Sequence, residues 1–221
     1  MNQDVNRDFP LIRAIRENVK CSLQLIANNS CLGYCPIAYY HENTTSFISQ
    51  VRAVKMEPVK EYCTLYCHSQ KLIDPANILA SEWIRPEDIH YYEEIGVDSF
   101  KLCDRTMPPE TIVKVVKAYT DRRYDGNFMD LLFSFVKRHK IILADPKIKK
   151  KTPIEGIYVD NRKLDGFIKY FISGDRRLSM DENLIYCRKW AEKAVTIDPQ
   201  YRKDALKGYS RAVKNLIHCK D

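Results

Sequence analysis

Four of the eight cysteines in this chain of 221 residues form two pairs with the same spacing. Cys31 and Cys35 make the first pair, Cys63 and Cys67 make the second, and three residues separate the members of each pair. Within a helical turn this spacing places both thiols on one face. The start of the chain, 1–8, is polar and does not read as a signal peptide. We therefore expect a reducing cytoplasm, where paired cysteines bind metal rather than form disulfides.

Four thiols are a ligand set for a 4Fe–4S cluster, and zinc accepts the same set. Structural zinc sites commonly place two residues between paired cysteines, so the spacing of three favours the cluster, with zinc as the alternative. His41 and His68 lie close to the pairs in the sequence and are candidates for a fourth ligand or for a group that orients the ligands. Surface or packing roles stay open for both histidines, and so does a core that simply buries four cysteines.

Three cations, Arg85, Lys101 and Arg105, are candidates for substrate binding. Arg85 follows one predicted strand, whereas Lys101 and Arg105 flank the end of the next. The ends of neighbouring parallel strands meet at one mouth in α/β folds, where such cations would hold a carboxylate or a phosphate. Ion pairs with the acidic residues beside them would explain the same three cations without a ligand.

The elements that would position these residues alternate between strands and helices. Apolar runs predict buried strands, and apolar residues at helical spacing predict helices. The stretch 37–54 reads as less regular because its middle is polar. The expected elements are a helix over 9–19, a strand over 21–27, a strand over 81–84, a helix over 85–95, a strand over 97–102 and a helix over 108–119. This alternation is typical of βα units in a parallel sheet or barrel.

Three strands are too few for an eight-stranded barrel. We therefore predict an α/β fold in which residues 1–132 form a partial TIM-type barrel, corresponding to its C-terminal half. Residues 133–221 are expected to form a basic, mostly helical region. Helices are predicted over 128–136, 162–172, 184–195 and 201–218. A half barrel has open sheet edges, which a second chain that supplies the N-terminal half would cover.

Composition limits the partners of the chain. Hydrophobic residues make up 45% of the sequence, which is enough for a packed core, and the net charge of +7 suits anionic partners. We expect an anionic small molecule, with RNA as an alternative through the lysine run 149–151. No apolar run approaches the roughly 20 residues of a membrane span. The sequence contains no glycine-rich phosphate loop, zinc-protease helix or nucleophile elbow, so its residues do not indicate a conventional protease.

Longer strings of residues resemble the collagenase-like peptidase family, family thirty-two of the peptidases of unassigned mechanism. The strings are Leu23–Pro36 with its two cysteines, Trp83–Asp88 and Tyr119–Asn127, and the resemblance covers about residues 6–132. It implies a TIM-type barrel and, in several branches, oxygen-independent hydroxylation or RNA modification with prephenate as the oxygen donor. Those branches carry a 4Fe–4S cluster on four cysteines, so the matching motifs give the ligand role to the two cysteine pairs here.

Three hypotheses for function follow. The first is an iron–sulfur enzyme or enzyme subunit that hydroxylates or otherwise modifies an anionic substrate. The second is a peptidase acting on collagen-like or other peptides, as the family's name suggests. The third is a non-catalytic, metal-stabilised subunit that completes a split barrel, because members of the family have further βα units ahead of the region that this chain resembles.

Overall fold

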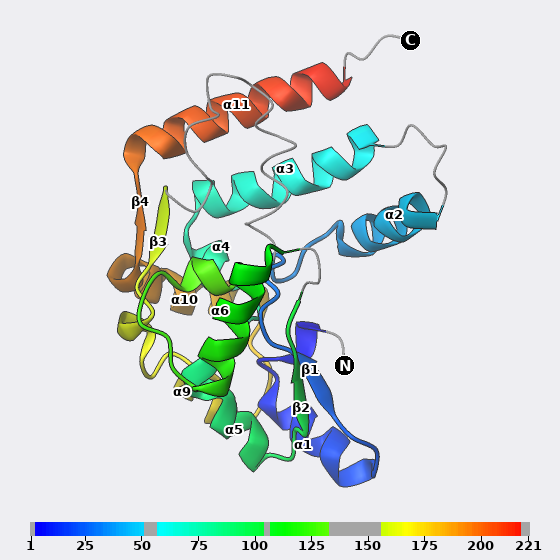
Figure 1. Cartoon of the computed structure of the whole chain (residues 1–221), viewed down its shortest axis with the longest axis vertical. Coiled ribbons are helices and arrows are strands. Elements are labelled where there is room, and N and C mark those ends of the chain that lie inside the picture. Colours follow the sequence, from blue (N-terminus) through cyan, green and yellow to red (C-terminus); the bar gives the residue numbers. More distant parts are fainter. Residues whose placement is uncertain (1–2, 51–56, 104–106, 133–155, 218–221) are drawn as a thin grey trace.

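The structure, a computed structural model, describes residues 3–50, 57–103, 107–132 and 156–217 (Figure 1). Arg105 and the lysine run 149–151 lie outside the described residues. The elements in chain order are η1 (Gln3–Val5), α1 (Phe9–Asn18), β1 (Gln24–Ile26), α2 (Ala38–Gln50), α3 (Glu57–Ile73), α4 (Ala76–Leu79), η2 (Pro86–Asp88), α5 (Ile89–Glu94), β2 (Ser99–Lys101), α6 (Pro109–Thr120), η3 (Phe128–Leu131), β3 (Ile157–Val159), η4 (Arg162–Leu164), α9 (Lys169–Ile172), α10 (Met180–Ala194), β4 (Val195–Ile197) and α11 (Pro199–Ile217).

Helix α1 confirms the prediction for 9–19. The carboxylate of Asp8 accepts a hydrogen bond from the backbone N–H of Leu11 at 3.0 Å, which satisfies a donor of the first turn. Phe9 and Ile12 are completely buried, so the apolar stripe of the helix faces the core as its spacing indicates.

Strands β1 and β2 confirm two of the three predicted strands. They pair in parallel, with Leu25 opposite Phe100, and Leu25 is completely buried. The third expected strand, over 81–84, is wrong, because this segment forms no ladder with β1. It is joined to the end of β1 by a hydrogen bond from the N–H of Ile84 to the carbonyl of Ala27 at 2.8 Å. Its two apolar residues, Trp83 and Ile84, are buried in the core without strand pairing.

Helix α2 corrects the expectation of an irregular stretch over 37–54. Glu42 and Asn43, in the polar middle of the stretch, lie on the exposed side of the helix, so they do not interrupt its backbone hydrogen bonds. Its neighbour α3 carries the second cysteine pair, and α11 packs along α3 in the same part of the molecule (Figure 1).

After Arg85, the observed helices lie where helices were predicted, although some differ from the prediction in length. Helix 85–95 begins as the 3-10 turn η2 and continues as α5, and Gly96 ends it with a positive φ of 87°. Helix α6 matches the prediction for 108–119. The expected helix over 128–136 begins as the 3-10 helix η3, and its remainder from 133 onward lies outside the described residues.

The C-terminal part of the chain combines helices with a small antiparallel sheet. Helices α10 and α11 confirm the predictions for 184–195 and 201–218, whereas the helix over 162–172 is divided into η4 and α9 around Gly166, whose φ is +80°. Strands β3 and β4, which pair in antiparallel register, were not expected. Each has three residues, too short for alternation along the sequence to reveal it.

One buried core extends from α1 to α11. Trp83 is a buried member of this core, with its ring 4.7 Å from that of Phe128 and 5.6 Å from that of Phe167. The guanidinium of Arg7 stacks over Trp83 at 4.8 Å. Within the described residues, no helix is both long enough and apolar enough to cross a membrane.

Candidate functional site

The first cysteine pair lies in a tight turn that follows β1, not in a helix. The N–H of Cys31 donates to Oδ1 of Asn29 at 3.2 Å, and Tyr34 adopts a positive φ of 57°. A Cβ at Gly33 would lie 2.6 Å from the carbonyl oxygen of Ala80, so only glycine fits this close approach. The turn is therefore fixed against the segment after α4 by backbone geometry.

The second pair lies on α3, as the spacing predicts. Cys63 and Cys67 are four residues apart and share one face of the helix, and Cys63 is buried. One turn further along, Lys71 is completely buried and its ammonium donates to the carbonyl of Ser30. Lys71 thus connects the helix of the second pair directly to the turn of the first.

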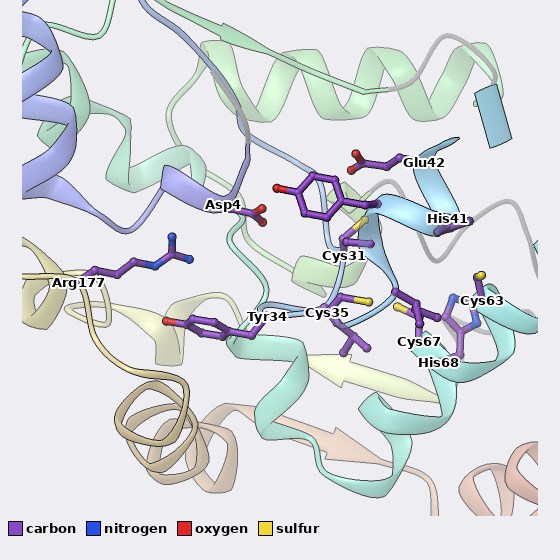
Figure 2. Close-up of a pocket in the computed structure, with 14 residues that line it drawn as sticks. Asp4, Cys31, Tyr34, Cys35, His41, Glu42, Cys63, Cys67, His68 and Arg177 are labelled. Carbon is purple, nitrogen blue, oxygen red and sulfur yellow. The ribbon is translucent and has the colours of Figure 1, made fainter. Parts of the chain in front are cut away.

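Both pairs line a single cavity of about 390 Å³ (Figure 2). All four cysteines contribute to its wall, together with His41 and His68. Apolar side chains from the turn and from α2 cover much of the remainder, among them Leu32 and Ile37. The structure thus brings together six of the residues that the sequence singled out, from three separate segments of the chain.

Electrostatic coupling links the two pairs inside this cavity. Burial raises the pKa of the Cys35 thiol, the nearby Cys67 thiol adds to the rise, and the backbone N–H of Ile37 and the charge of Lys71 oppose it. No disulfide joins any cysteines among the described residues. In that same part of the chain, no three His, Cys, Asp or Glu side chains are already gathered closely enough to hold a metal ion. The thiols share a cavity without converging on one point.

The donor set nevertheless fits an iron–sulfur cluster or zinc in its chemistry. Thiolates are the ligands that both accept, and four thiols are the number that a complete site requires. Of the two histidines, His68 is buried, with its ring 6.3 Å from that of Tyr209 on α11. His41 lies in the first turn of α2 and is partly exposed.

The residues predicted to bind an anion lie elsewhere. Arg85 is 3% exposed, and its guanidinium donates to Oδ1 of Asn161 at 2.9 Å, to the carbonyl of Asn161 at 3.0 Å and to the carbonyl of Leu164 at 2.8 Å. Glu87 and Asp88 each lie 3.5 Å from it. Arg85 therefore joins η2 to η4, and it borders a separate hollow of about 310 Å³ rather than the cysteine cavity.

Lys101, the second predicted cation, does not join Arg85. Lys101 ends β2 with an exposed side chain and does not line the cysteine cavity. Arg105 lies outside the described residues. Arg85 and Lys101 occupy different surroundings, so the structure does not bring these two cations together at one mouth. The position of Arg105 at that mouth stays a prediction.

A charged group that the sequence did not single out enters the cysteine cavity instead. Arg177, from the loop between α9 and α10, lines the cavity together with Tyr34 and Asp4 (Figure 2). Its Nη2 lies 2.6 Å from Oε1 of Glu82, and its guanidinium lies 5.2 Å from the centre of the Tyr34 ring. Nothing in the sequence connects position 177 with position 34, because only the tertiary fold brings them together.

Glu82 is the other group that sequence reasoning missed. Its side chain is 5% exposed, and its Oε2 atom is buried with no hydrogen-bond partner among the described residues. Burial raises the pKa of Glu82 to about 7, although the positive charges of Arg177 and Arg7 act in the opposite direction. Together with Cys31 it borders a narrow hollow beside the main cavity.

Comparison with known proteins finds a relative of this chain that is named as a protease. The chain is 33% identical over 197 residues to an uncharacterized protease of Methanocaldococcus jannaschii, and the match includes 89% of this chain. The chain spans about half of the length of that relative, 53%. The sequence matches no known protein-family profile, and no solved structure shows a significant match to it. The relative's name agrees with the peptidase part of the resemblance, and an iron–sulfur branch stays a prediction.

Proposed function

We propose that this chain is an iron–sulfur protein, similar to the collagenase-like peptidases, that acts as an enzyme or enzyme subunit on a small anionic substrate. The observation that carries the proposal is that Cys31, Cys35, Cys63 and Cys67 line one cavity. Core cysteines that serve only packing are normally surrounded by other side chains rather than gathered around a shared hollow. Zinc bound by the same thiols is the alternative occupant.

These four cysteines would hold the cluster, two from the turn after β1 and two from α3. When bound, such a cluster supplies one-electron transfer or the activation of an oxygen donor. The chain's own residues fix the two segments relative to each other. Gly33 packs against Ala80, and Lys71 donates to Ser30. Where apolar side chains such as Leu32 and Ile37 line the cavity, charges would interact more strongly than at the open surface.

Metal analysis after anaerobic purification tests the proposal. We expect about four iron and four sulfide per chain, a brown colour and their loss in Cys63→Ser. Cys21→Ser is the matched control, since Cys21 is an exposed cysteine that does not line the cavity. Zinc without iron would replace the cluster with a structural metal site. A chain that binds neither metal, with Cys63→Ser no different from Cys21→Ser, would contradict the proposal.

A peptidase is the second candidate, and the printed name of the M. jannaschii relative favours it. The cavity combines thiols with His41 and His68, the groups from which a cysteine nucleophile and its base could be drawn. Casein and gelatin cleavage by the metal-free chain would support this candidate if Cys35→Ser abolished it. Under the iron–sulfur proposal, neither substrate is cleaved.

A second chain that extends the sheet of β1 and β2 is part of the proposal. In the described residues these strands form a parallel sheet of two strands, whereas parallel sheets are usually wider and covered on both faces. Added strands would cover their edges and lead to a larger barrel. A monodisperse, stable monomer in sedimentation experiments at micromolar concentration would contradict this part of the proposal.

A further inference from the structure

Arg177 reaches into the cysteine cavity from the loop before α10, on the side away from Cys63 (Figure 2). Two neighbours fix its orientation. One edge of the guanidinium faces Glu82, with Nη2 2.6 Å from Oε1, and one of its faces lies over the ring of Tyr34 at 5.2 Å. The side chain remains 32% exposed and forms part of the cavity wall.

We propose that Arg177 binds the carboxylate of a small substrate whose apolar or aromatic body occupies the cysteine cavity. The guanidinium fork matches a carboxylate in a bidentate arrangement, which a lysine ammonium does not. This inference rests on the proposed function in one respect, because it takes the cysteine cavity as the substrate site. It reassigns anion binding from Arg85, whose guanidinium is occupied by Asn161 and Leu164.

The arginine is held in place before any ligand arrives. Tyr34, on which it stacks, donates from its hydroxyl to the carbonyl of Leu178 at 2.6 Å. The same tyrosine has a positive φ of 57°, an uncommon conformation for a residue with a side chain. A ligand therefore meets a guanidinium that has already lost much of its rotational freedom, which lowers the entropic cost of binding.

Other charges around the cavity disfavour a second negative charge on the ligand. Asp4 and Glu42 also line the wall and would repel a second carboxylate or a polyphosphate. Glu82, when ionised, neutralises part of the charge of Arg177. Burial and the charge of Asp4 disfavour that ionised form, whereas Arg177 and Arg7 favour it. Leu32, among the apolar lining residues, suits the body of the ligand rather than its charge.

The competing explanation is purely structural. An ion pair between Arg177 and Glu82 could simply attach the loop before α10 to the segment after α4, with no ligand involved. In that case substitution of Arg177 would change the stability of the chain but would not change its selectivity for charged over neutral molecules.

Ligand-observed NMR titration separates the two explanations, with benzoate as the probe and benzamide as its neutral isostere. We expect benzoate to bind more tightly than benzamide, and Arg177→Met to weaken benzoate binding by about 10- to 100-fold while leaving benzamide unchanged. Arg177→Lys should bind benzoate with intermediate affinity. Arg176→Met is the matched control, because Arg176 is the adjacent arginine and pairs with exposed Glu182 outside the cavity.

The titration is run on the anaerobically purified chain, and again on the same chain after its iron has been removed. Equal affinity for benzoate and benzamide in the unaltered chain would overturn the inference, and so would the absence of benzoate binding or an equal loss in Arg176→Met. The comparison of benzoate with benzamide does not require Arg177→Met to fold. If the chain binds iron but does not prefer benzoate over benzamide, the role of Arg177 is refuted and the cluster is not. If the chain prefers benzoate but binds no iron, the cluster is refuted and the role of Arg177 is not.

Discussion

Glu82→Gln should change how the stability of the protein depends on pH. The carboxylate is 5% exposed, and burial raises its pKa from 4.5 to about 7. Between these two values the folded state binds more protons than the unfolded state, so the free energy of unfolding falls as pH rises. The cost of the charged carboxylate is absent below pH 4.5 and fully present above about pH 7.

The size of this cost follows from the pKa difference. At about 1.4 kcal/mol per pH unit, a rise from 4.5 to about 7 corresponds to a cost of about 3 kcal/mol at pH 8. Glutamine has the shape of protonated glutamate and no charge to bury. Glu82→Gln should therefore gain about 3 kcal/mol over the unaltered protein between pH 4.5 and pH 8. The attraction of Arg177 is already included, because it lowers the same pKa.

Urea unfolding at half-unit steps of pH, followed by circular dichroism, measures this difference. Burial also raises the pKa of Asp88, to about 6, but that residue contributes equally to both proteins and cancels. A constant offset from packing of the amide would not alter the slope. Parallel stability curves for the two proteins from pH 4.5 to pH 8 would refute the reasoning, since they would mean that the carboxylate is no harder to ionise in the folded state.

Two further substitutions test the arrangement around the site. Arg85→Met should destabilise the fold by about 3–5 kcal/mol in urea unfolding, because it leaves Asp88 buried without its cation, whereas exposed Lys101→Met should change stability by less than about 0.5 kcal/mol. Equal losses of stability in Arg85→Met and Lys101→Met would contradict a structural role for Arg85. Gly33→Ala should lower the free energy of unfolding by about 1–3 kcal/mol and reduce metal retention, because its Cβ would lie 2.6 Å from the carbonyl oxygen of Ala80. Undiminished metal content in this variant would show that metal binding does not need the turn in this form.

Much of the first half of the fold could be predicted, because its signals are local. The stripe of α1, the buried run of β1 and the glycine that ends α5 each depend on residues that are close in sequence. The second cysteine pair belongs to the same class, because Cys63 and Cys67 need only a helix to share a face. The first pair has the same spacing, yet Gly33 and the conformation of Tyr34 place it in a turn.

The predictions of secondary structure failed where the burial of side chains did not determine the backbone conformation. Trp83 and Ile84 are apolar because they enter the core, not because residues 81–84 pair as a strand. In α2, Glu42 and Asn43 face solvent and Thr44 is buried, so the polar run that suggested irregularity is compatible with a helix. A sequence pattern reports the surroundings of side chains, and more than one backbone conformation can supply the same surroundings.

The candidate site was predictable in its thiols and not in its charges. A cation beside a predicted strand end could bind a ligand or hold the fold together, and the pattern does not separate these roles. Arg85 became structural because Asn161, 76 residues away, supplies its partners. Arg177 entered the cavity through its contacts with Glu82 and Tyr34, which are even more distant in sequence. Long-range pairing of this kind leaves no local signal.

The content of iron and acid-labile sulfide in the anaerobically purified chain tests the central claim most directly. The account predicts about four of each per chain, retained in Cys21→Ser and lost when Cys63, which lines the cavity with the other three paired cysteines, is replaced by serine. A purified chain that contains neither iron nor sulfide, and that does not acquire them on anaerobic reconstitution, would contradict it.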